Sequence, residues 1–254
     1  MAAINYLIAA WHGARRFDEQ CPRPERSTYY LEEQFKYLGT LEHQLRQITV
    51  IVPALEEAPD EYTEYLDALP SRMGKTKIVV FPRQNIGISY GGFVEAARHY
   101  KADFRHFMLV EDDYVPVSNK FDTVFLDALT KNARQQKKKA GYVCSHMIKD
   151  CPAHSVGLVT TEAMAAAHKG HVAIINRRRP AELEAAYCIQ TEFAKPVIRN
   201  GYSFGHISDH YRVPFTDSRY WPSYRELSRS TGPVVFSPVQ FASEFDGSGG
   251  ESKT

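Results

Sequence analysis

The chain has 254 residues, of which 43% are hydrophobic and 24% charged. At roughly 150 residues per domain this length fits one large domain or two fused halves, and the composition excludes both a multi-domain array and global disorder. Its 31 Lys and Arg residues against 30 Asp and Glu residues give a formal net charge of +1, which excludes a dominant electrostatic partner such as duplex nucleic acid.

Apolar runs alternate with helical patterns through the first half of the chain. We predict buried strands over residues 4–10, 48–52, 78–81 and 107–110, each followed by polar residues or proline. Between them we predict helices over residues 28–47, 60–69 and 89–100. This alternation predicts an α/β fold whose central, mostly parallel sheet has helices on both faces and binds ligands at the carboxyl ends of its strands.

The second half of the chain is less regular. We predict a strand over residues 142–146 and helices over residues 161–168 and 182–197. From Tyr202 onward the sequence is rich in aromatic residues and prolines, and residues 247–254 are predicted to form a flexible tail. We therefore expect a single domain over residues 1–246, divided into a nucleotide-binding half (1–115) and an acceptor half (116–246).

Several features bear on the cellular compartment. The apolar stretch Ile4–Trp11 has no basic residue before it and is interrupted by Asn5, so it is interpreted as a buried strand and not as a secretory signal. No run approaches the 18 apolar residues needed to span a bilayer, so any membrane contact is expected to be peripheral. The four cysteines form no C-x-x-C pair, which favours a reducing compartment, and we predict a cytoplasmic protein.

Three consecutive acids, Glu111, Asp112 and Asp113, follow the fourth apolar run directly. Adjacent carboxylates repel one another, and a divalent cation is an economical way to compensate them. Because alternate side chains of a strand share a face, Glu111 and Asp113 are expected to point into one pocket and Asp112 away from it. Hard oxygen ligands at this spacing suit Mg²⁺ or Mn²⁺ with positions left for phosphate oxygens. The alternative is a solvated acidic turn.

A second motif, RQNIGISYGG over residues 83–92, follows the third predicted strand and opens a helix. Its backbone N–H groups and Arg83 can face an anionic ligand. The glycine spacing matches neither G-x-G-x-x-G nor a P-loop, which argues against a dinucleotide-binding fold and against a P-loop enzyme. The alternative is a turn with close helix packing.

Taken in chain order, these motifs resemble the GT-A glycosyltransferases, in particular the inverting family-2-like group that includes rhamnosyltransferase-like enzymes. The first strand runs into Ala9-Ala10-Trp11-His12, where that family begins its nucleotide pocket. The segment 83–92 is similar to its N-x-G and glycine-rich segment, and FMLVEDDYVP over residues 107–116 to its metal-binding D-x-D strand end. IQTEFAKPVIRNGYSFGHISDH over residues 189–210 resembles the later segment in which an acid precedes a helix and a Gly-Tyr turn.

The resemblance implies a nucleotide-diphosphate sugar as donor and Mn²⁺ or Mg²⁺ as the metal. It implies that Asp113 and Glu111 hold the metal, with His206 or His210 as a further ligand. The residues it implies for the nucleotide pocket are Ala10, Trp11, His12, Arg83, Asn85, Gly87, Gly91 and Asp112.

The resemblance also implies a reaction. A metal neutralises the charge on the departing diphosphate, so one protein carboxylate suffices as the general base that takes the proton of the acceptor hydroxyl. Glu192 is the candidate for that base and Asp209 is the reserve. The acceptor would be a saccharide or glycolipid hydroxyl, and transfer would invert the anomeric centre.

Two other functions remain open. One is a nucleotidyltransferase on a related scaffold, although we expect its usual glycine- and Arg/Lys-rich N-terminal loop to be absent after Ala10. The other is a non-catalytic nucleotide- or sugar-binding protein, for which a retained base at Glu192 has no use. The released product separates the three functions, because it is a nucleoside diphosphate, pyrophosphate, or nothing.

Overall fold

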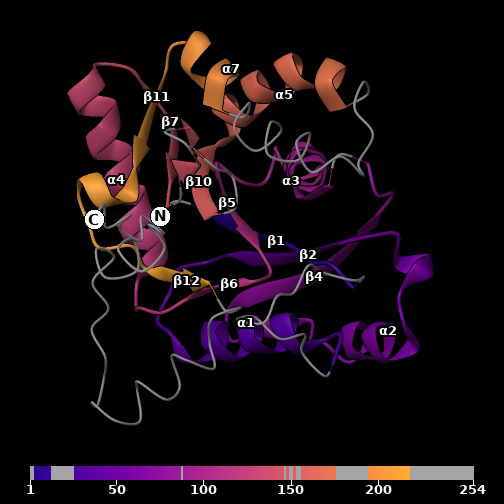
Figure 1. The fold of residues 1–254 in the computed structure, drawn as a ribbon. Coiled ribbons are helices and arrows are strands. Elements are labelled where there is room, and N and C mark those ends of the chain that lie inside the picture. The colour runs from indigo at the N-terminus through magenta and orange to yellow at the C-terminus, as the bar shows by residue number, and fades with distance from the viewer. Residues whose placement is uncertain are drawn as a thin grey trace, which may run out of the picture. The chain divides into compact units, whose positions relative to one another are not determined.

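The fold is described from a computed structural model (Figure 1). It covers residues 3–12, 26–86, 88–145, 147–148, 151–152, 156–175 and 194–217. All of these residues belong to one compact unit that spans Met1–Ser218.

An eight-stranded sheet forms the centre of this unit, in the order β11-β7-β10-β5-β1-β2-β4-β3. Its strands are β1 (Ile4–Ala9), β2 (Gln47–Pro53), β3 (Arg72–Met73), β4 (Thr76–Arg83), β5 (His106–Glu111), β7 (Lys139–Cys144), β10 (Val156–Thr160) and β11 (Tyr202–His206). Strands β5, β1, β2 and β4 run parallel to one another, and β7 runs parallel to β11. Strand β10 is antiparallel to both β5 and β7, and β3 is antiparallel to β4. Two short pairs lie outside the sheet: β6 (Tyr114–Pro116) with β12 (Phe215–Asp217), and β8 (Met147–Ile148) with β9 (Cys151–Pro152).

Helices cover both faces of the sheet (Figure 1). They are α1 (Tyr29–Thr40), α2 (Asp60–Asp67), α3 (Ile88–His99), α4 (Phe121–Gln136), α5 (Thr161–Ile175) and α7 (Ala194–Arg199). Side chains of α1, α2 and α4 join one apolar core with alternate residues of the strands. Side chains of α3, α5 and α7 form a second core on the opposite face. Strands β1 and β2 are buried along their whole length, as expected for strands covered on both faces.

The predicted α/β class and the elements of the first half are confirmed. One boundary was wrong: the helix expected over residues 28–47 ends at Thr40, because the chain turns there and enters β2 at Gln47. In the second half, α5 extends beyond the expected 161–168, and α4, β10 and β11 were not predicted. Of the helix expected over residues 182–197, the structure describes only α7 from Ala194, and the remainder lies outside the described residues.

The topology brings one set of strand ends together. Because β5, β1, β2 and β4 are parallel neighbours, their carboxyl ends lie along the same edge of the sheet. The residues that follow them, after positions 111, 9, 53 and 83, are those in which the sequence predicted a ligand site. No helix in the described part of the chain is long and apolar enough to cross a membrane.

Candidate functional site: a pocket at the carboxyl edge of the sheet

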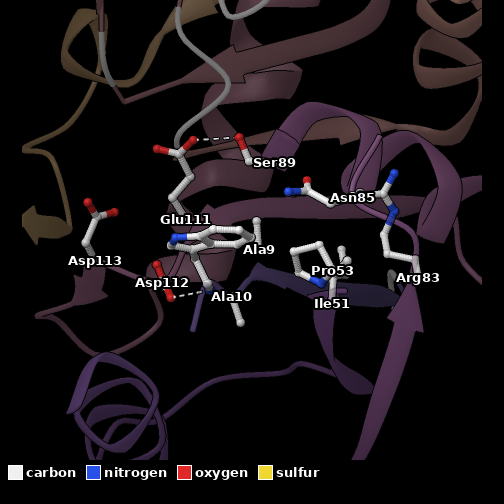
Figure 2. A pocket seen from close by; sticks show the side chains of 12 residues that line it. Ala9, Ala10, Ile51, Pro53, Arg83, Asn85, Ser89, Glu111, Asp112 and Asp113 are labelled. Atoms are coloured by element: carbon white, nitrogen blue, oxygen red, sulfur yellow. Dashed lines mark hydrogen bonds between the residues drawn. The ribbon is translucent and has the colours of Figure 1, made fainter. Parts of the chain in front are cut away.

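A pocket of about 370 Å³ lies at these strand ends (Figure 2). It runs from the acids after β5, past the ends of β1 and β2, to the end of β4 and the first turns of α3. Its lining residues are Ala9, Ala10, Trp11, Ile51, Pro53, Arg83, Asn85, Ser89, Gly92, Glu111, Asp112 and Asp113. β5 and β4 are separated by three strand spacings, about 14 Å, so the pocket is elongated along this edge of the sheet.

The three consecutive acids all line the pocket, but two of them have distinct hydrogen-bond partners. Glu111 Oε1 accepts a hydrogen bond from Ser89 Oγ at 2.7 Å, which ties the end of β5 to the first turn of α3. Asp112 is 3% exposed, and its Oδ2 accepts from the backbone N–H of Trp11 at 2.9 Å. Its own N–H donates to Ala9 O at 3.2 Å. Through these two backbone contacts, Asp112 fixes the chain that leaves β1.

Arg83 stands at the opposite end of the pocket, at the end of β4. Its side chain is only 3% exposed. Nε donates to Glu95 Oε2 at 2.8 Å, and Nη2 donates to Ile86 O at 2.6 Å. Nη1 is buried and has no hydrogen-bond partner in the described part of the chain. The ion pair and the carbonyl hold the guanidinium in place before any ligand arrives.

The glycines of the second motif allow α3 to approach this loop. A Cβ on Gly91 would lie 2.0 Å from Ile86 O, and one on Gly92 would lie 3.0 Å from Ile51 Cγ2. Gly91 therefore shapes the loop, and it is Gly92 that lines the pocket. Asn85 also lines it, whereas Gly87 lies outside the described residues.

The chain that leaves β1 forms a further wall. Ala10 and Trp11 line the pocket, as the resemblance implied. His12 does not line it: its ring stacks on Trp11, and its Nε2 lies 3.0 Å from Pro53 O and 3.1 Å from Ala54 O. His12 thus connects the end of β1 to the end of β2.

The later predicted residues lie away from the pocket lining. His206 ends β11, which is three strands from β5, about 14 Å. Its Nδ1 accepts from Ser208 N at 3.1 Å, and its backbone N–H donates to Asp209 Oδ2 at 3.1 Å. His210 Nε2 donates to Asn132 Oδ1 of α4 at 2.8 Å. These contacts order a short 3₁₀ turn over Ile207–Asp209 and its junction with α4.

The carboxylates that line the pocket supply only part of the ligand set that a divalent metal needs. Among the described residues, no group of three or more His, Cys, Asp and Glu side chains is arranged to hold a metal ion. Glu111 and Asp113 nevertheless line the same pocket, and Mg²⁺ is commonly bound by one or two carboxylates with substrate phosphates and water supplying the rest. The two acids fit that mode of binding.

A buried tyrosine lies close to the acid end. Tyr142 of β7 crosses the sheet face over Gly157, where an added Cβ would lie 2.3 Å from its hydroxyl oxygen. Complete burial raises the pKa of the Tyr142 phenol well above its usual range, and negative charge at Cys144 and Glu111 adds to the effect. The phenol is therefore neutral and packs as part of the core beneath Glu111.

The sequence left five lining residues unassigned. Ala9, Ile51, Pro53, Ser89 and Gly92 lie at a strand end or in the first turns of a helix. Their position within or next to the predicted strand ends and motifs was a usable signal, because both ends of such a connection face the same edge of the sheet. Glu192, the predicted base, lies outside the described residues.

Comparison of the sequence with models of known protein families and with curated proteins gave no match. Solved structures do match. A mannosyltransferase from Pyrobaculum calidifontis, in complex with GDP-Man and Mn²⁺, is 10% identical with a TM-score of 0.51, covering 80% of this chain and 54% of that one. A 4-diphosphocytidyl-2C-methyl-D-erythritol synthase from Anaerococcus prevotii is 13% identical with a TM-score of 0.50, covering 90% and 99%.

A putative glucose-1-phosphate thymidylyltransferase from Bacillus anthracis, in complex with a sucrose, is 9% identical with a TM-score of 0.49, covering 93% of this chain and 98% of that one. At such identities a structural likeness concerns the fold. The chain has the α/β fold of nucleotide-diphospho-sugar transferases, which confirms the predicted fold class.

Proposed function

We propose that this protein is a metal-dependent glycosyltransferase that moves a sugar from a nucleotide-diphosphate donor to a saccharide or glycolipid hydroxyl, with inversion. The observation that carries the proposal is the two-ended pocket. Carboxylates of Glu111 and Asp113 stand at one end and the pre-ordered Arg83 guanidinium at the other. A nucleoside diphosphate is long enough to reach from one end of the pocket to the other, and we place its phosphates near Glu111 and Asp113.

The residues of the chain have separate tasks in this proposal. Mn²⁺ or Mg²⁺, when bound by Glu111 and Asp113, neutralises charge on the departing diphosphate. Ser89 orients Glu111 through their 2.7 Å hydrogen bond. The Asp112 carboxylate accepts a hydrogen bond from the backbone N–H of Trp11 and so holds Trp11 in the wall of the pocket. These positions are set before the ligand binds, so little reorganisation remains for the reaction itself.

The acceptor side of the proposal rests on residues 116–246. Glu192 takes the proton of the acceptor hydroxyl as this oxygen attacks the anomeric carbon from the face opposite the diphosphate. Asp209 is the reserve base, although its carboxylate already accepts from His206 N–H. His206 or His210 is the proposed further metal ligand. To serve as one, His206 would have to leave its contact with Ser208, or His210 its contact with Asn132.

A product assay tests the proposal. The protein is incubated with UDP-, GDP-, dTDP- and CMP-sugars, an acceptor panel and Mn²⁺, and released nucleotide is measured. We expect one donor to yield a free nucleoside diphosphate. Glu192→Gln should keep donor affinity yet lower turnover by roughly 10²- to 10⁴-fold, while Glu184→Gln, in the same segment, should not. Normal turnover by Glu192→Gln would remove Glu192 from the mechanism and make Asp209→Asn the next variant.

A nucleotidyltransferase is the second candidate, favoured by the likeness of fold to the Anaerococcus prevotii synthase over nearly the whole of both chains. The sequence also departs from the expectation that a glycine- and arginine-containing loop is absent after Ala10, because Gly13, Arg15 and Arg16 follow Trp11 and offer a glycine and two cations for a triphosphate. In the same assay, nucleoside triphosphates with sugar phosphates would then release pyrophosphate. That result would replace the glycosyltransferase proposal.

A further inference from the structure

Two carbonyl groups converge on the ring of His12. Its Nε2 lies 3.0 Å from Pro53 O and 3.1 Å from Ala54 O. A carbonyl oxygen can only accept, so Nε2 must carry a hydrogen and share it between the two. The residue is 8% exposed, and a shared hydrogen bond in such a site is protected from competition by water.

The backbone that His12 holds is in an unfavourable conformation. Ala54 has φ 48° and ψ 51°, the left-handed helical region. A residue with a Cβ is strained there, and such a residue persists only where its surroundings over-determine it. Three contacts do so: the N–H of Ala54 donates to Arg83 O at 2.8 Å, and its carbonyl accepts from the N–H of Glu57 at 3.0 Å and from His12 Nε2 at 3.1 Å.

The imidazole itself is fixed by ring contacts on two sides. It stacks on Trp11 with centroids 5.2 Å apart and an interplanar angle of 23°. It meets Tyr62 of α2 edge-on at 5.5 Å and 60°. His12 therefore links the end of β1, the end of β2 and α2, and its two neighbours Trp11 and Pro53 both line the pocket.

We propose that His12 is a positioning residue for the pocket: its Nε2–H holds the carbonyls of Pro53 and Ala54, keeps Ala54 left-handed, and thereby fixes Pro53 and Trp11 as walls for the nucleoside. The identity of the ligand rests on the proposed function. The hydrogen bond from His12 to Ala54 does not depend on that function, and its effect on Ala54 can be tested without any ligand.

The first test uses the wild-type protein. Long-range ¹⁵N NMR spectra of the histidine side chains report which ring nitrogen carries the hydrogen at neutral pH. We expect His12 to carry it on Nε2. A His12 ring with its hydrogen on Nδ1 alone cannot donate to either carbonyl and would overturn the proposal.

The second test is amide hydrogen exchange of Ala54, whose N–H makes the last hydrogen bond of the β2–β4 ladder, directly beside the carbonyls that His12 holds. His12→Phe keeps a ring against Trp11 but removes the donor, whereas His12→Gln places an amide N–H near the position of Nε2. We expect Ala54 to exchange about tenfold faster or more in His12→Phe and near the wild-type rate in His12→Gln, with amides of β1 and β5 unchanged in both. Unchanged exchange at Ala54 in His12→Phe would contradict the proposal. If His12→Phe does not fold, His12→Gln and the wild-type spectra still decide.

The third test joins the turn to the pocket. Glycine adopts the left-handed region without strain, so Ala54→Gly should make the pocket less dependent on His12. We expect His12→Phe to weaken binding of the preferred nucleotide about tenfold in the Ala54 background and distinctly less in the Ala54→Gly background. An equal loss in both backgrounds would refute the coupling. Failure of the wild-type protein to bind any nucleotide would count against the proposed function, and exchange at Ala54 would still decide the role of His12.

Discussion

Glu111, Asp112 and Asp113 are consecutive, yet their carboxylates have different surroundings. Glu111 accepts from Ser89 of α3, and Asp112 accepts from the backbone of Trp11. Asp113 lines the pocket and is largely buried. The Asp112 carboxylate already accepts a backbone N–H and is poorly placed to bind a metal as well. We therefore propose Glu111 and Asp113 as the metal ligands.

Ser89→Ala tests how far Glu111 depends on its partner. A hydrogen bond to a charged group contributes about 1.5–3 kcal/mol, and part of this orients Glu111 for the metal. We expect metal-dependent nucleotide affinity to fall about tenfold by titration calorimetry, with the midpoint of thermal unfolding little changed. Ser27→Ala is the matched control, because Ser27 does not line the pocket and also donates to a glutamate, Glu61, at 3.4 Å. Equal effects of the two variants would contradict the assigned role of Ser89.

His106, at the start of β5, gives a prediction for pH. Burial lowers its pKa from the ordinary value of 6.5, opposed by Glu162 and supported by Arg105. The unfolded chain therefore binds a proton more readily than the folded protein, so stability is lost as pH falls below 6.5 through the lower folded pKa. We expect His106→Gln to lose less unfolding free energy than the wild type between pH 7.5 and pH 5.5 in urea titrations. Equal losses would show that His106 does not titrate as described.

Some of the site could be predicted residue by residue and some could not. Arg83, Glu111 and Asp113 were predictable, because charged residues directly after an apolar run mark a strand end. The role of His12 was not, because it depends on Ala54 being left-handed, and alanine gives no sequence signal for that conformation. Ser89 was missed for a related reason: its partner Glu111 is 22 residues away in the sequence.

At the scale of elements, local pattern predicted β1, β2, β4 and β5 because each is a short apolar run with a polar or proline end. Local pattern did not predict β10. This strand is antiparallel to both neighbours, and such pairing depends on contacts that are distant in the sequence. Local pattern also failed at α4. That helix carries Asp122 and Asn132 buried in its apolar face, which blurs the helical period.

The packing of β7 on β10 makes a sharp prediction. Gly157 has no room for a methyl group: its Cβ would lie 2.3 Å from the hydroxyl oxygen of Tyr142 and 2.4 Å from Cε2. The Tyr142 ring is completely buried and cannot move aside. We expect Gly157→Ala to lower the free energy of unfolding by about 3 kcal/mol in denaturant titrations.

Gly74→Ala separates this steric effect from backbone strain. Gly74 has φ +59° but no atom within 4 Å of the added Cβ, so its substitution should cost only about 1 kcal/mol. A loss at Gly157 no larger than the loss at Gly74 would show that the ring of Tyr142 does not occupy the space above Gly157.

At the scale of the whole molecule, the fold places distant segments around one pocket. Residues 9–11, 51–53, 83–92 and 111–113 meet there because four parallel strands end at the same edge. The acids and the guanidinium stand at opposite ends of the pocket, across three strand spacings. The central claim is that this pocket binds a nucleoside diphosphate through a metal held by Glu111 and Asp113.

Titration calorimetry with UDP, GDP, dTDP and CMP, each in Mn²⁺ and in EDTA, tests this claim most directly. We predict that one nucleotide binds in Mn²⁺ and loses most of its affinity in EDTA. Asp113→Asn should lose the same affinity in Mn²⁺, whereas Asp103→Asn, an exposed acid just before β5, should keep it. Binding of none of the four nucleotides, or binding indifferent to both EDTA and Asp113→Asn, would contradict the account and leave Glu111, Asp112 and Asp113 as an acidic turn.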